Sequence, residues 1–255
     1  MAGNEQDKYQ DICYAKNYLS EVICRLDFAD QMKVFNSTMP REVYGVVRKY
    51  YPIAEPQEVV GAQFQVNPIS GTVINNMVSK NWVFWARNKE SSCSIDSTRV
   101  VFSVKKYSVF DSLYKAVSEI MRVILDLNPD CQGKRLGLRY INSLPMKEPE
   151  YRIADKYFKA LDIMRNDDTL RLYTQMVYYV PETDIRVNLQ YGYPNPDFPA
   201  KLKNRSFLID TDAFYQGILF SEDIDEMVMN MHTEAQKCFE NMITDSFRKE
   251  LNSEE

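Results

Sequence analysis

The ten residues 133–142, GKRLGLRYIN, constrain the fold more than any other stretch of the 255-residue chain. Their side chains alternate in character, which predicts a β-strand with one face on a core and one cationic face. The core face carries Leu136, Leu138 and Tyr140, and the opposite face carries Arg135, Gly137, Arg139 and Ile141. Because Gly137 has no side chain, it leaves a notch between the arginines that a backbone, a ring or an anion can approach.

Hydrophobic periodicity predicts an ordered series of strands and helices along the chain. Strands are expected at 21–28, 61–66, 81–88, 98–104, 134–142, 170–180, 184–191 and 206–214, and helices at 40–51, 108–127, 151–164 and from 221 to 251. Ser108 and Asp111 have the spacing of a capping box at the start of the second helix. The short turn at 181–183 predicts a hairpin between the strands that flank it.

The element order predicts an α+β protein with antiparallel sheets, each covered by a long amphipathic helix. The Pro-flanked stretch 143–150 is the best internal boundary, and it divides the chain into halves at 1–148 and 149–255. The first half contains the helix near 108–127, and the second contains three strands and the C-terminal helix. Because both halves repeat the order of strands followed by a long helix, we expect a structural duplication within one compact unit.

Charge and cysteine content disfavour several classes of protein. A net charge of −5 and an isoelectric point near 5.2 argue against a broad electrostatic grip on nucleic acid. The five cysteines form no C-x-x-C pair and there is one histidine, so we expect reduced thiols, no metal and no cofactor. Residues 1–11 lack the basic start and apolar run of a signal peptide, and no stretch approaches the roughly 20 apolar residues that span a membrane. We therefore expect a cytoplasmic protein with no membrane partner.

The only histidine, His232, limits nucleophilic catalysis, because serine and cysteine nucleophiles usually need a histidine base. It lies at the border of the apolar stripe of the last predicted helix, near Val228, Ala235 and Phe239. The favoured interpretation is a structural hydrogen bond or interhelical contact, and the alternative is ligand binding or proton transfer. The sequence contains no nucleophile elbow, phosphate-binding loop, dinucleotide-binding glycine run or zinc-protease motif. We therefore favour a protein that is not an enzyme, with His232 as a candidate if it is one.

Asp210 and Asp212 alternate on a predicted strand, so both carboxylates share one face at about 6.6 Å along the strand. Such a pair can hold a divalent cation or act in acid–base catalysis, which makes both residues catalytic candidates. The favoured alternative is an ion-pair network with Arg135 and Arg139, because arginine binds carboxylates in a bidentate manner.

Basic residues also recur near aromatic ones, and this combination can form a pocket for a nucleotide or a short RNA through charge and stacking. The ligand-binding candidates are Arg135, Gly137, Arg139 and Tyr140. Further basic residues stand at 105–106, at 134 and within 201–205, and the neighbouring rings are Tyr107, Tyr140 and Phe207. Solvated strand ends explain the same pattern equally well.

Several segments together carry a resemblance to a known family. They are residues 18–23, the central block 135–142 (RLGLRYIN), the strand 208–212, and His232, Phe239, residues 243–244 and Arg248 near the C-terminus, with His232 and Phe239 in an H-x6-F pattern. On these residues the chain resembles a family of sporadically distributed, uncharacterised bacterial and archaeal proteins of similar size. The resemblance implies no reaction, cofactor or substrate, and the patchy distribution of the family implies an association with mobile or defence genes.

Two functional hypotheses follow. The first is a non-enzymatic binding or regulatory module in a larger assembly, in a defence or toxin-neutralising setting, with a protein partner or a second copy of the chain. The alternative is a protein that binds or processes a nucleotide or short RNA on the face of Arg135 and Arg139.

Overall fold

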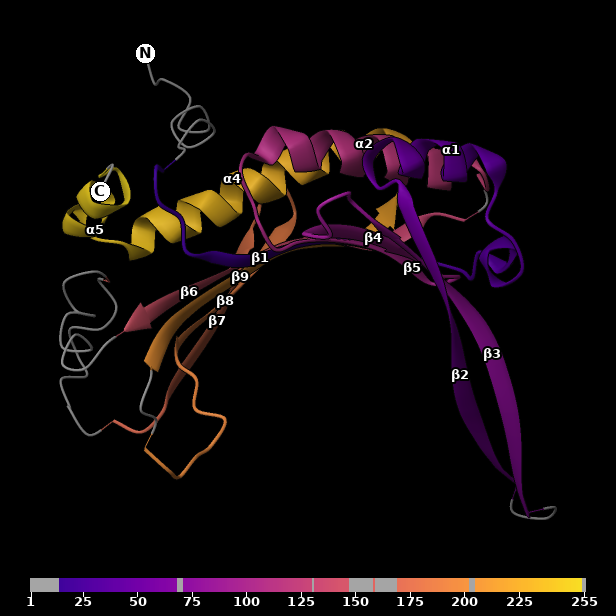
Figure 1. Cartoon of the computed structure of the whole chain (residues 1–255), viewed down its shortest axis with the longest axis horizontal. Coiled ribbons are helices and arrows are strands. Elements are labelled where there is room, and N and C mark those ends of the chain that lie inside the picture. The colour runs from indigo at the N-terminus through magenta and orange to yellow at the C-terminus, as the bar shows by residue number, and fades with distance from the viewer. Residues whose placement is uncertain are drawn as a thin grey trace.

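The computed structural model describes residues 14–67, 71–129, 131–146, 158, 169–201 and 205–253, and within them nine antiparallel strands form one sheet (Figure 1). The strands are β1 (Leu19–Phe28), β2 (Ile53–Asn67), β3 (Gly71–Trp85), β4 (Ser91–Ile95), β5 (Arg99–Val104), β6 (Gly133–Met146), β7 (Leu172–Val180), β8 (Ile185–Tyr193) and β9 (Arg205–Leu219). Their order across the sheet is β2-β3-β4-β5-β1-β6-β9-β8-β7.

The sheet is arched, and the longer helices lie over its convex face (Figure 1). The helical elements are η1 (Lys33–Asn36), α1 (Arg41–Tyr50), α2 (Phe110–Asp126), η4 (Ser221–Asp223), α4 (Ile224–Met242) and α5 (Asp245–Leu251). Alternate residues of β1, namely Val22, Cys24 and Leu26, are fully buried, as period-2 alternation requires of a strand with one face on the core. The hydrophobic core therefore lies between the helices and one face of the sheet.

The pairing of β6 with β9 joins the two predicted halves of the chain into one sheet, because β6 lies within 1–148 and β9 within 149–255. Leu138 lies opposite Ala213 and Leu136 lies opposite Tyr215 in this antiparallel pair. The α+β architecture with antiparallel strands is thus confirmed. The expectation of separate sheets is wrong, because β6 of the first half and β9 of the second are hydrogen-bonded neighbours in a continuous sheet.

The C-terminal helix is interrupted, whereas the sequence predicts one continuous helix. α4 ends at Met242, Ile243 is extended, and α5 begins after Thr244. The side chain of Thr244 accepts a hydrogen bond from the backbone N–H of Phe247, as an N-cap does. The break redirects the chain so that Phe247 and Leu251 are buried, at 1% and 2% exposure.

Two local predictions have opposite outcomes. The hairpin at 181–183 is confirmed, since β7 pairs with β8 up to Val180 and Ile185. The capping box at the start of α2 is wrong, because the helix begins at Phe110 and its N-cap, Val109, offers no side-chain hydrogen bond. The boundary between 148 and 149 and the predicted helix 151–164 lie outside the described residues, except for Phe158, which forms an isolated antiparallel β-bridge with Ile243. In the described part of the chain, no helix has the length and apolarity needed to cross a membrane.

Candidate functional site

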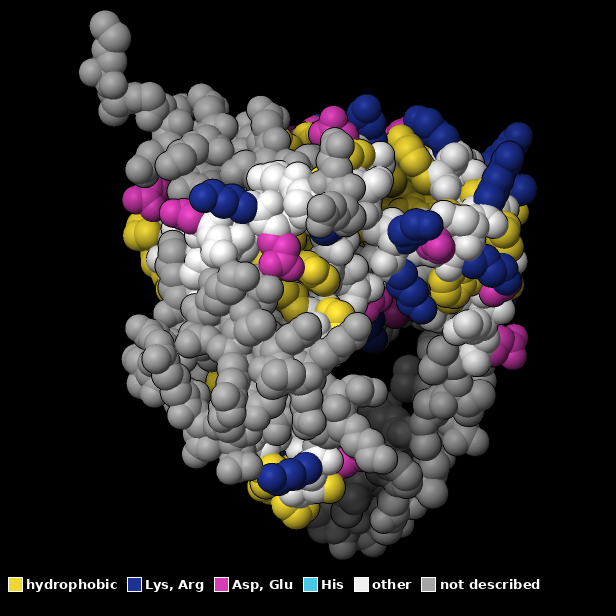
Figure 2. Space-filling model, turned by 60° about the vertical axis from the view of Figure 1, so that its left-hand side comes forward, with side chains coloured by type: hydrophobic (Ala, Val, Ile, Leu, Met, Phe, Trp, Pro, Cys, Tyr) yellow, Lys and Arg dark blue, Asp and Glu magenta, His cyan; other side chains and the backbone are white. Residues whose placement is uncertain are grey.

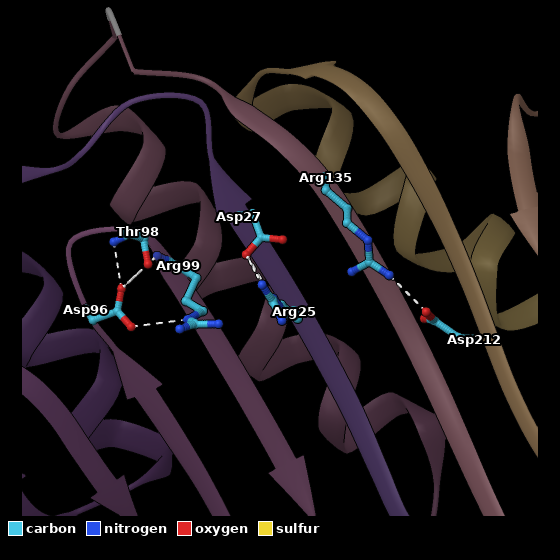
Figure 3. Close-up of polar contacts among 7 residues, drawn as sticks. All are labelled: Arg25, Asp27, Asp96, Thr98, Arg99, Arg135 and Asp212. Carbon is cyan, nitrogen blue, oxygen red and sulfur yellow. Dashed lines mark hydrogen bonds and ion pairs between the residues drawn. The ribbon is translucent and has the colours of Figure 1, made fainter. Parts of the chain in front are cut away.

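The polar face of the central strands carries two ion pairs between β6 and β9, of which Figure 3 shows the pair of Arg135 with Asp212. Arg135 donates from Nη2 to Oδ2 of Asp212 at 2.8 Å, and Arg139 donates from Nε to Oδ1 of Asp210 at 2.7 Å with a second contact to Oδ2. Both pairs run diagonally across the sheet, because the direct strand neighbour of Arg139 is Asp212. The predicted ion-pair network is therefore confirmed.

Gly137 allows the guanidinium of Arg135 to lie flat on the sheet. A Cβ atom at this position would stand 2.9 Å from Nη1 of Arg135 and 3.2 Å from Oδ1 of Asp212. The same guanidinium lies over the ring of Phe214, with Cζ 4.9 Å from the ring centroid, which is a cation–π distance. The notch that the sequence predicts is thus filled by a side chain of the same strand.

Charge on this face is compensated within the protein. Burial raises the pKa of Asp212, and the neighbouring Arg135 and Arg139 oppose that shift. The hydrogen bond from Arg139 to Asp210 raises the pKa of the arginine. Arg25 and Asp27 on β1 form a further pair at 2.7 Å (Figure 3).

Charges of both signs are mixed on the described part of the face in Figure 2. Among the described residues, no three His, Cys, Asp or Glu side chains come together to hold a metal ion. Figure 2 shows Lys and Arg side chains interspersed with Asp and Glu over the described part of one face. A cation at Asp210 and Asp212 would have to compete with the two arginines that already bind them.

Tyr140 lies on the opposite face of β6, where it meets α4 instead of the arginines. Its hydroxyl is 2.8 Å from Nδ1 of His232. The imidazole ring in turn stacks on Phe110, with centroids 3.8 Å apart and planes 7° apart. The grouping of Tyr140 with Arg135 and Arg139 in one ligand site is therefore wrong, because adjacent residues of a strand point to opposite faces. Phe207, also expected near the basic residues, is fully buried in the core.

Burial determines the protonation state of this contact. It lowers the pKa of His232 to about 4, an effect that the carboxylate of Asp111 only partly opposes. Burial also raises the pKa of Tyr140 well above its ordinary value, and Tyr107 adds to that shift. Near neutral pH both groups are uncharged, so they serve as hydrogen-bonding groups more readily than as an acid and a base.

Tyr140 and His232 line a cavity of about 380 Å³ between the sheet and the C-terminal helices. β6 contributes Tyr140, Asn142 and Leu144, α4 contributes Met229, His232, Ala235, Gln236 and Phe239, α5 contributes Phe247 and Leu251, and the remaining wall comes from Thr211 and from segments 14–19 and 107–111. Its volume lies within the range of small-molecule sites, which is about 300–1,000 Å³.

Contacts near the C-terminus hold the outer wall of the cavity in place. Tyr14 donates a hydrogen bond to Glu240 at 2.5 Å, and Nε of Arg248 contacts the same carboxylate at 2.7 Å. Tyr18 stacks on Phe247 of α5 with centroids 6.0 Å apart. Because α5 turns away after the break at Ile243, its aromatic side chain reaches this wall.

Asn142 is the functional candidate that sequence reasoning missed. Its residue exposure is 8%, it lines the cavity, and its side-chain amide makes no hydrogen bond within the described part of the chain. The signal was present in the sequence, because Asn142 follows Tyr140 by two residues and so shares its face.

Neither the comparison with protein-family models nor the search of curated proteins finds a match for this chain. The resemblance carried by the central block RLGLRYIN therefore stays a prediction. The case for a function consequently depends on the geometry of the described residues.

Proposed function

We propose that the protein is a non-enzymatic binding module that holds a small ligand in the cavity between β6 and α4. The observation that carries this proposal is the cavity itself, a largely apolar space of about 380 Å³ with a few polar residues in its lining. Ligand sites commonly combine an apolar lining with a small number of polar groups that orient the ligand.

The chemistry of the lining supports binding more than catalysis. The partner of His232 in the cavity is a phenol, Tyr140, and not a serine or cysteine nucleophile. Four cysteines, at 24, 93, 131 and 238, are buried, and burial raises the pKa of Cys24 to about 12. A thiol in such surroundings stays protonated and is a poor nucleophile.

The proposal is tested by filling the cavity. Toluene, a small apolar probe, should give intermolecular NMR contacts to Tyr140 and His232 and should raise the melting temperature of the wild-type protein. Ala235→Leu places extra carbon atoms in the cavity and should abolish both effects while the protein stays folded. Ser94→Leu, on the other face of the sheet, is the matched control and should leave toluene binding intact. Toluene binding that survives Ala235→Leu, or that is absent in the wild type, would refute the proposal.

A second proposal concerns assembly, and the edge strand β7 favours a second copy of the chain as the partner. Tyr173, Val177 and Tyr179 on this strand are 62%, 57% and 52% exposed. The strand contains no charged residue or proline of the kind that natural edges use against pairing. An antiparallel pair of two β7 strands centred on Met176 would place Tyr173 opposite Tyr179 of the second copy, and such cross-strand aromatic pairs stabilise sheets.

Sedimentation analysis tests this assembly. The wild-type protein should form a dimer, Val177→Lys should give a monomer with an unchanged circular dichroism spectrum, and Ser94→Lys away from the edge should leave the dimer intact. A monomeric wild type, or a dimer that tolerates Val177→Lys, would exclude β7 as the contact. A defence or toxin-neutralising role stays a prediction that this geometry does not address.

We also infer a structural duplication behind the fold, with α2 covering the first half of the sheet and α4 the second. The support is the strand order, in which β1 and β6 are central neighbours, with β2 to β5 extending outward beside β1 and β7 to β9 extending outward beside β6. The repeat boundary would then precede β6 and not follow residue 148. The alternative of nucleotide or RNA binding on the Arg135 and Arg139 face would require those arginines to leave Asp212 and Asp210. We therefore place the ligand on the other face of β6.

A further inference from the structure

We infer that the cavity takes an uncharged, planar compound that presents a hydrogen-bond donor and an acceptor side by side, and that Asn142 recognises it. Primary amides, lactams and the edges of nucleobases share this arrangement. The inference rests on the proposed function of the cavity and deepens it by naming the class of ligand.

The accessible amide of Asn142 is the first argument. Its backbone is engaged in the sheet between Leu19 and Ile209, so only the side chain is available to the cavity. The residue is 8% exposed and lines the cavity, and its amide atoms are not among the fully buried, unpaired side-chain atoms of the described residues. Because no hydrogen bond joins this amide to another described residue, the amide stays accessible from the cavity. Its donor and acceptor are therefore open to a bound molecule.

The geometry of an asparagine amide defines the complementary group. It offers a carbonyl acceptor next to an NH₂ donor, so it pairs in a bidentate manner with an edge that carries a donor next to an acceptor. A compound with only a carbonyl satisfies one half of this pair. Discrimination between the two kinds of compound is therefore the property that Asn142 should control.

The charges around the cavity argue for a neutral ligand. The charged residues of its lining are Lys16 and Asp111. Lys16 donates to Ser253 at 3.0 Å, and Asp111 is exposed in the first turn of α2. Tyr140 and His232 are bonded to each other. A charged group beside Asn142 would lose its hydration without gaining an opposite charge.

The aromatic side chains of the wall argue for a planar ligand. Tyr18, Phe239 and Phe247 lie around the same space as Asn142. Their rings offer flat apolar surfaces and edges that favour stacked or edge-to-face contact with another ring. A planar compound can meet these rings and the amide of Asn142 together.

Three probes of nearly the same shape test the inference on the full chain. Benzamide carries a donor and an acceptor, acetophenone carries only the acceptor, and benzoate carries a charge. NMR titration should show that the wild type binds benzamide about tenfold more tightly than acetophenone, a difference of about 1.4 kcal/mol, and does not bind benzoate. Asn142→Leu, which keeps the size of the side chain, should bind benzamide and acetophenone equally.

The outcomes separate this inference from the proposed function. Equal binding of benzamide and acetophenone by the wild type, tight binding of benzoate, or discrimination that persists in Asn142→Leu would overturn the ligand class, although toluene would still enter the cavity. If toluene does not enter either, the proposed function itself fails. Should Asn142→Leu not fold, the comparison of the probes on the wild type still decides.

Discussion

Replacing His232 with phenylalanine should remove most of the acid sensitivity of the fold between pH 8 and pH 5. Burial lowers the pKa of His232 to about 4, against about 6.5 in the unfolded chain. Between these values the unfolded state binds the proton and the folded state does not. Stability is therefore complete above the unfolded pKa and is lost as the pH falls toward the folded pKa. The loss attributable to His232 is about 2 kcal/mol at pH 5 relative to pH 8.

Urea unfolding of the wild type and of His232→Phe at several pH values measures this difference. Because His232 is the only histidine of the chain, the other titrating groups should contribute similarly to both proteins. Tyr140→Phe is the control, since it removes the hydrogen bond to Nδ1 but leaves the ring buried. It should lose about 1 kcal/mol at every pH and keep the acid sensitivity. Parallel pH profiles for the wild type and His232→Phe would refute the argument that burial depresses this pKa.

Three further substitutions probe the fold around the site. Gly137→Ala should lose about 1 kcal/mol of unfolding free energy, because the new Cβ displaces the guanidinium of Arg135. The loss should vanish when Arg135 is replaced by leucine. If the two substitutions instead have additive effects, the guanidinium does not lie against Gly137. Arg139→Leu should lose about 2 kcal/mol because it leaves Asp210, whose side chain is 6% exposed, without its cation, and this loss should exceed that of Lys49→Leu, whose partner Glu119 is 38% exposed; equal losses would contradict this. Thr244→Ala should lose about 1 kcal/mol by removing the cap of α5, and Thr244→Ser should restore it, whereas an unaffected Thr244→Ala would count against the cap.

The parts of the fold that depend on local alternation were predictable from sequence. The period-2 pattern of β6 assigned Leu138 and Arg139 to opposite faces, and the shared spacing of Asp210 and Asp212 correctly suggested their pairing with arginines. Which aspartate binds which arginine was not predictable, because the pairs run diagonally between strands whose register only the sheet determines. The same limit applies to Tyr140, whose partner lies 92 residues away.

The cavity could not be predicted because no single segment forms it. The apolar stripe of the last helix continues into residues 245–251, so the sequence gives little warning of the break at Ile243. Thr244 is a favourable N-cap residue, but threonine also occurs within helices. Its presence in the sequence therefore does not show that one helix ends and another begins there. Without that turn, Phe247 would not meet Tyr18, and the outer wall would be absent.

The two faces of β6 differ in whether their polar side chains are paired within the protein. On the polar face, where water could hydrate the side chains, Arg135 and Arg139 are nevertheless paired within the protein. On the core-facing side, Asn142 lines the cavity, and its amide makes no hydrogen bond to another described residue. The apolar wall around it offers this amide little to bond with. Departures from local consistency tend to mark functional positions. The half-buried, paired arginines are therefore the structural feature of this strand, and Asn142, two residues beyond Tyr140, is the better place to look for its ligand.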